Sequence, residues 1–144
     1  MRVIVQRALN AKCIIDNKIV SQIDKGYMLL VSFTEGDNEA IINKMIKKII
    51  NLRIFEDENG KMNLNIKQVG GKILSISQFT LYANTNEGNR PSFVNALPGP
   101  KSSILYDKFN ELLAKEIEVQ TGVFGADMNI DFVNNGPCTI LLEF

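Results

Sequence analysis

The sequence has 144 residues, of which 45% are hydrophobic and 22% are charged, and its formal net charge is zero. These values predict a single globular domain, and they exclude a large electrostatic nucleic-acid surface while leaving room for a small RNA-end site. The chain has no histidine, which excludes Ser-His-Asp and Cys-His catalysis and removes the commonest metal ligand.

Two features of the sequence indicate the compartment. Cys13 and Cys138 are far apart and form no CxxC pair, so we expect reduced core thiols and no disulfide framework or zinc site. The apolar run at the N-terminus is short and flanked by Arg2 and Arg7, which does not fit a signal peptide or a membrane span. We therefore expect a cytoplasmic protein.

The first half of the chain predicts strands followed by a helix. Residues 1–8 are rich in β-formers, residues 11–16 and 18–24 predict a hairpin around Asn17, and the apolar run 26–33 predicts a buried central strand. Within residues 35–55 the period changes to that of a helix, with Asp37 or Asn38 as its cap. The apolar stripe of this helix consists of Ile42, Met45, Ile46, Ile49 and Ile50.

The second half predicts a similar alternation. Two short strands within 52–64 flank the turn signal Asn59-Gly60, and residues 70–83 predict one long strand followed by a polar loop. Residues 99–116 predict a second amphipathic helix with Pro100 in its first turn, and residues 117–144 predict further strands. The whole chain, 1–144, therefore predicts one α+β domain, in which a curved, barrel-like antiparallel or mixed sheet carries two amphipathic helices on one side.

The first candidate for chemistry is SISQFTLYA, residues 75–83. As a strand it would have no cleanly apolar face, because Ser77, Gln78 and Thr80 form a polar cluster. The simpler interpretation is that these side chains bond backbone carbonyls at a strand end. A hydroxyl nucleophile would need a base, and no histidine is available. A backbone oxyanion hole needs only N–H groups, each worth about 3–4 kcal/mol.

The second candidate is NNGPCT, residues 134–139, which interrupts a strand-like run. The simpler interpretation is a tight turn between two strands. If the Gly136-Pro137 bond were cis, both carbonyls could face one direction and form a rigid acceptor pair for an ammonium group. The sequence leaves the isomer open.

Three other segments have weaker patterns. In TGVFGADM, residues 121–128, Phe124 lies between two glycines, which fits either a core aromatic in a turn or a stacking surface for a nucleobase. In GNRPSF, residues 88–93, Arg90 is most simply an exposed loop charge. The acidic run at Glu56, Asp57 and Glu58 surrounds a turn and indicates solvation, so no metal site is predicted.

Together these segments resemble one family. SQFTL at 77–81 and NNGPCT at 134–139 resemble the two signature motifs of the D-aminoacyl-tRNA deacylases, also called D-tyrosyl-tRNA deacylases. Segments 1–8, 51–66, 88–93 and 121–128 fit the same family in order, so the resemblance covers essentially the whole chain. Cys138 stands where the family usually has valine, which is a swap of one small residue for another.

The resemblance implies an enzyme that hydrolyses the ester of D-aminoacyl-tRNA, and of mischarged glycyl-tRNA, as chiral proofreading in translation. It implies a homodimer that binds the 3′ end of aminoacyl-tRNA, with no cofactor, metal, DNA or membrane partner. A cis Gly136-Pro137 dipeptide would reach into the partner's pocket and select the chirality of the substrate. The residues carried over are Ser77, Gln78, Phe79 and Thr80 for catalysis, Arg7, Gly136 and Pro137 for chiral selection, and Phe124, Ala126 and Met128 for the terminal adenosine.

The absence of histidine also bears on the mechanism. The 2′-hydroxyl of the tRNA would help to activate the attacking water, with the oxyanion held by N–H groups near Phe79 and Thr80. Thr80 itself is the second choice as nucleophile or orienting group. Two other functions stay open at this point: a non-catalytic module that binds an RNA end, and a general esterase that uses Thr80 or Ser77.

Overall fold

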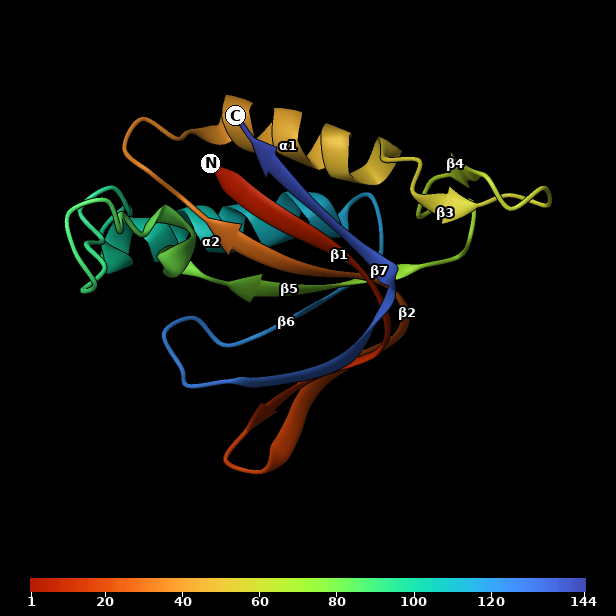
Figure 1. The fold of residues 1–144 in the computed structure, drawn as a ribbon, viewed down its shortest axis with the longest axis horizontal. Coiled ribbons are helices and arrows are strands. Elements are labelled where there is room, and N and C mark those ends of the chain that lie inside the picture. Colours follow the sequence, from red (N-terminus) through yellow and green to blue (C-terminus); the bar gives the residue numbers. More distant parts are fainter.

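The computed structural model describes all residues, 1–144, as an α+β fold (Figure 1). Its elements, in chain order, are β1 (Arg2–Ile15), β2 (Lys18–Ser32), α1 (Glu39–Asn51), β3 (Phe55–Glu56), β4 (Met62–Leu64), β5 (Lys72–Ser77), the short 3₁₀ helix η1 (Phe79–Tyr82), α2 (Gly99–Ala114), β6 (Val119–Thr121) and β7 (Asn129–Glu143).

The main sheet is mixed and has the strand order β6-β5-β2-β1-β7. β1 is antiparallel to both β2 and β7, whereas β5 is parallel to both β2 and β6. Figure 1 shows that β1, β2 and β7 curve strongly. The predicted mixed, curved sheet is confirmed, but the barrel-like closure is wrong. β6 and β7 end the order without pairing to each other, so the sheet stays open.

The long hairpin β1–β2 replaces four shorter predicted segments. Residues 1–8 and 11–16 belong to one strand, and residues 18–24 and 26–33 belong almost entirely to the next. The predicted turn around Asn17 is confirmed, since both Asp16 and Asn17 have positive φ, at 49° and 60°, as a two-residue turn with matching twist requires. Asn10 also has a positive φ of 52°, so β1 is distorted there without ending.

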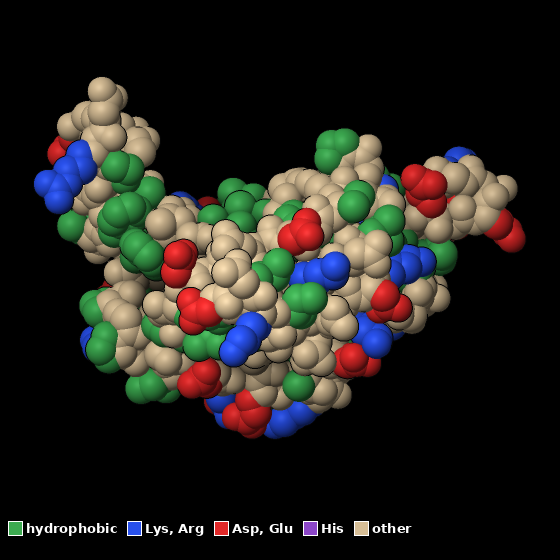
Figure 2. Space-filling view, turned by 90° about the horizontal axis from the view of Figure 1, so that it is seen from below, with side chains coloured by type: hydrophobic (Ala, Val, Ile, Leu, Met, Phe, Trp, Pro, Cys, Tyr) green, Lys and Arg blue, Asp and Glu red, His purple; other side chains and the backbone are tan.

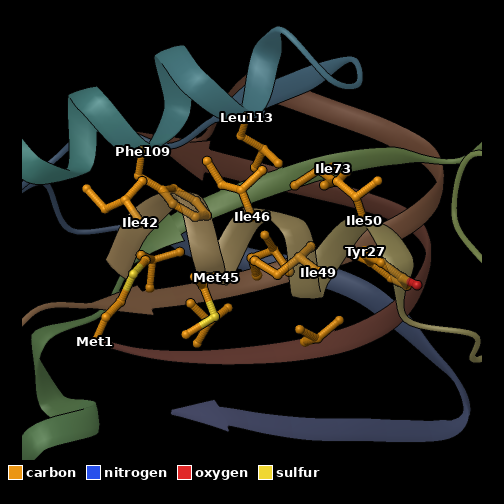
Figure 3. Packing of buried hydrophobic residues seen from close by; sticks show 14 of the residues in the cluster. Met1, Tyr27, Ile42, Met45, Ile46, Ile49, Ile50, Ile73, Phe109 and Leu113 are labelled. Carbon is orange, nitrogen blue, oxygen red and sulfur yellow. The ribbon is translucent and has the colours of Figure 1, made fainter. Parts of the chain in front are cut away.

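The main core lies between the helices and one face of the sheet. The five apolar residues predicted for the stripe of α1 are the five that it buries, and Asn38 caps this helix by accepting hydrogen bonds from the N–H groups of Ala40 and Ile41 at 3.0 and 3.2 Å. In Figure 3, Ile42 and Ile46 of α1 lie beside Phe109 and Leu113 of α2. Both helices contribute to one cluster with β1, β2 and β5, which confirms that they share one side of the sheet.

The predicted long strand 70–83 is wrong in its second half. β5 ends at Ser77, and the N–H of Gln78 donates to the carbonyl of Val31 at 2.8 Å. The chain then turns into η1. The polar cluster that would leave a strand without a cleanly apolar face therefore marks the place where the strand ends.

Neither α1 nor α2 has the length and apolar character that a membrane crossing would need.

Candidate functional site

A cavity of about 530 Å³ opens where the end of β5, the start of α2 and the β6–β7 loop meet. Apolar side chains from the sheet form much of its inner surface, among them Val31, Ile76 and Ile130. In Figure 2 the segment between η1 and α2 stands out at the left, and hydrophobic side chains gather along it toward the body of the molecule. This arrangement suits a ligand that combines apolar surface with a few polar groups.

One wall of the cavity is formed by Ser77, Gln78 and Phe79. In η1 the first hydrogen bond inside the turn runs from the N–H of Leu81 to the carbonyl of Gln78, at 3.3 Å. The N–H groups of Phe79 and Thr80 come before this bond and have no acceptor within the turn. The start of η1 therefore leaves two neighbouring backbone donors without a partner in the turn, and one of them belongs to Phe79, which lines the cavity.

Thr80 does not line the cavity, although it belongs to the same motif. The side-chain amide of Gln78 donates to its Oγ1 at 2.6 Å, and the residue is exposed. No histidine exists in the chain and no carboxylate bonds this hydroxyl. The arrangement therefore gives Thr80 no base that would make it a nucleophile.

A second wall of the cavity comes from the β6–β7 loop. Phe124, Ala126 and Met128 all line the same cavity as Ser77 and Phe79. Met128 packs closely on Gly122, where an added Cβ would lie 2.6 Å from its sulfur atom. Phe124 is half-buried, with its ring centroid 5.9 Å from that of Tyr106, so it packs partly on the core. It also lines the cavity, and stacking of a nucleobase on its ring stays a prediction.

Tyr106 packs against Phe124 of this wall. Its hydroxyl donates to the carbonyl of Ser75 at 2.7 Å, and burial raises the pKa of Tyr106 above its ordinary value. The phenol therefore stays protonated and serves as a structural donor. This hydrogen bond connects α2 to β5.

Two groups of residues at the cavity were not predicted from the sequence. Phe93 lines the cavity, its ring makes an edge contact with the ring of Phe79 at 5.0 Å between centroids, and both side chains are exposed. Pro98, Gly99 and Ser102 place the N-terminus of α2 in the cavity lining. An aromatic side chain in a polar loop was the available signal for Phe93, and the helix start at Pro100 was the signal for α2.

Gly136 and Pro137 lie on a bulge of β7, away from the cavity in the same chain. Gln6 pairs with Thr139 and Ala8 with Asn134, so residues 135–138 face only Arg7 across the ladder. The Gly136-Pro137 peptide bond is cis, and both residues are exposed. Neither residue lines the cavity.

Arg7 lies against this bulge from the buried side. Its Nε donates to the carbonyl of Asn135 at 3.0 Å and its Nη1 to the carbonyl of Ile54 at 2.8 Å, while only 6% of the residue is exposed. An added Cβ on Gly136 would lie 2.9 Å from Nη2 of Arg7. The structure thus gathers the predicted residues into two groups: residues 77–79 with 124–128 at the cavity, and Arg7 with Gly136 and Pro137 at the bulge.

Comparison with known proteins identifies the family of this chain. The family model described as D-Tyr-tRNA(Tyr) deacylase matches residues 4–143. The chain belongs to that family. Proteins named D-aminoacyl-tRNA deacylase from Lactobacillus gasseri and from Lactobacillus delbrueckii subsp. bulgaricus are 54% and 55% identical to it, over 99% of this chain and 99% of each relative.

Solved structures support the same fold for this family member. A structure titled c-Myc DNA Unwinding Element Binding Protein superimposes with a TM-score of 0.95 at 35% identity, and the match covers 100% of this chain and 99% of the other. A second structure, titled as an analysis of a probable eukaryotic D-amino acid tRNA deacylase, superimposes with a TM-score of 0.84 at 16% identity over 98% and 97% of the two chains. At that identity the second match speaks for the fold alone.

Proposed function

We propose that the cavity is the active site at which this D-aminoacyl-tRNA deacylase hydrolyses the ester between a D-amino acid and its tRNA. Family membership supports the reaction, and one observation supports the site. The motif residues Ser77 to Phe79 and the loop residues Phe124, Ala126 and Met128, more than forty positions apart in sequence, line the same cavity. The ester carbonyl binds at the first wall and the terminal adenosine at the second.

The reaction needs few protein groups. Water attacks the ester carbonyl, and the negative charge that develops on its oxygen is stabilised by the backbone N–H of Phe79, the residue of η1 that lines the cavity. One such donor contributes about 3–4 kcal/mol to the transition state. The 2′-hydroxyl of the terminal ribose helps to activate the water, because the chain has no histidine to do so. The proton passes to the ribose oxygen that leaves, so the products are the free amino acid and the tRNA.

The active protein is a homodimer in which each cavity is completed by the partner's Gly136-Pro137 bulge. Within one chain these residues are exposed and separate from the cavity, and Arg7 holds the bulge from its buried side. The two carbonyls of the dipeptide accept hydrogen bonds from the α-ammonium group of the substrate. The bulge then leaves no space for the side chain of an L-amino acid.

Selection through the α-carbon sets the specificity. A 1,000-fold preference for the D-enantiomer corresponds to about 4 kcal/mol of differential transition-state binding. Steric exclusion of a side chain can supply this energy, whereas glycine has no side chain to exclude. Mischarged glycyl-tRNA is therefore a second substrate.

The reaction takes place in the cytoplasm, and the two buried free thiols at Cys13 and Cys138 fit a reducing compartment.

A deacylation assay with matched D-tyrosyl-tRNA and L-tyrosyl-tRNA tests the proposal. We expect release of the D-amino acid without added metal, and release of the L-amino acid slower by about 1,000-fold, as the steric argument requires. Equal release of both enantiomers, or release that depends on zinc, would contradict the proposal. Binding of the tRNA end without any turnover would favour a binding module instead.

A further inference from the structure

Asp127 is the only charged side chain that lines the cavity. It lies between Ala126 and Met128 on the β6–β7 wall and is exposed to solvent. Its carboxylate makes no hydrogen bond or ion pair within the chain. The turn that precedes it is held by a backbone hydrogen bond, from the N–H of Ala126 to the carbonyl of Val123 at 3.2 Å. Asp127 therefore has no visible task in holding its own loop.

A carboxylate at this place is unfavourable for a polyanionic substrate unless the substrate offers it a hydrogen-bond donor. A phosphate brought near Asp127 would be repelled, whereas an N–H group would be bound by a charged acceptor. The 3′ end of an aminoacyl-tRNA carries three kinds of donor near the cavity: the α-ammonium group, the ribose hydroxyl and the exocyclic amino group of the terminal adenine.

The position of Asp127 decides which of these three donors its carboxylate can bind. The α-ammonium and the ribose hydroxyl are each within a few bonds of the ester carbonyl, so they lie beside Phe79 on the first wall. The adenine amino group lies at the far end of the nucleoside, beside the second wall, which Asp127 shares with Phe124 and Met128. Apolar and aromatic contacts from that wall hold a base without reading its edge, and a carboxylate adds an acceptor for that edge.

We propose that Asp127 reads the terminal adenine by accepting a hydrogen bond from its N6 amino group, and thereby fixes the base and turns the preceding phosphate away from the cavity. This inference rests on the proposed function. Asp127 is a specificity-determining residue in this scheme and takes no part in proton transfer. A hydrogen bond to a charged acceptor at an exposed site makes a difference of about tenfold in kcat/KM.

The test uses the full-length protein and two D-tyrosyl-tRNAs, one ending in adenosine and one ending in purine riboside, which lacks the N6 amino group. We expect the wild type to prefer adenosine about tenfold in kcat/KM. Asp127→Ala should hydrolyse both substrates at the same rate, and Asp127→Asn, which keeps a neutral oxygen acceptor, should retain part of the preference. Asp127 is exposed and unbonded, so both variants should unfold at the temperature of the wild type.

Two results would overturn the inference and leave the proposed function standing. One is equal hydrolysis of the two substrates by the wild type. The other is a preference in Asp127→Ala as large as that of the wild type, which is also what a loss of activity equal for both substrates would leave. No release of D-tyrosine from the adenosine-ending tRNA would instead refute the proposed function, and the inference with it.

Discussion

Gly136→Ala is the substitution whose effect follows most directly from the geometry of the bulge. Gly136 has a φ of +127°, and an added Cβ would lie 2.9 Å from Nη2 of Arg7 and 3.0 Å from the backbone nitrogen of Cys138. Real Cβ atoms hardly ever approach other atoms so closely, and the backbone nitrogen belongs to the same bulge. Arg7 also cannot move freely, because it donates hydrogen bonds to the carbonyls of Asn135 and Ile54.

Two costs add up in this variant. A side chain at a φ in this region costs about 1–3 kcal/mol. Displacing Arg7 weakens buried hydrogen bonds that a charged donor makes, each worth about 1.5–3 kcal/mol. We therefore expect the free energy of unfolding, measured by urea denaturation, to fall by about 3–5 kcal/mol. We also expect the D-over-L preference to fall at least tenfold, because the two carbonyls shift.

Gly88→Ala is the matched control. Gly88 has nearly the same φ, +130°, but an added Cβ there would meet nothing within 4 Å. It should therefore show only the backbone cost, about 1–3 kcal/mol, with chiral preference unchanged. If Gly136→Ala and Gly88→Ala lost the same stability and both kept the preference, the reasoning about Arg7 and the bulge would be wrong.

The remaining predictions concern the first wall of the cavity. Phe79→Pro removes one backbone donor and should lower kcat for D-tyrosyl-tRNA by about 100- to 1,000-fold. Phe79→Ala keeps the N–H, and its kcat should stay within about tenfold of the wild-type value. Equal losses of kcat in both variants would argue against a backbone oxyanion hole. Thr80→Ala should keep most of the activity, because the hydroxyl bonds Gln78 and does not line the cavity. A covalent acyl-enzyme trapped on Thr80, or an inactive but folded Thr80→Ala, would favour the general esterase.

The sequence predicted the parts of the fold that depend on local pattern. The buried stripe of α1 repeats every three or four residues, and a helix imposes that period on any chain that packs one face. The turn at Asn17 and the cap at Asn38 also depend on their own side chains and neighbours. These features need no information from distant residues.

The end of β5 and the open sheet could not be predicted in the same way. Alternation indicates a strand but does not say where it stops, and here the last ladder bond joins Gln78 to Val31, 47 positions away. Closure of the sheet depends on which strands lie at its edges. The resemblance to the deacylase family indicated the two signature motifs and the loop residues. Phe93 and the start of α2 reach the cavity only through tertiary packing.

The central claim is that each active site combines one chain's cavity with its partner's bulge, and subunit complementation tests it most directly. Ala126→Trp fills the cavity, and Gly136→Val disrupts the bulge; each variant alone should be inactive toward D-tyrosyl-tRNA. Unfolding the two together and refolding them at equal amounts should restore about a quarter of the wild-type activity, because half of the dimers are mixed and each mixed dimer has one intact site. A mixture that stays inactive, although mixed dimers form, would contradict the account.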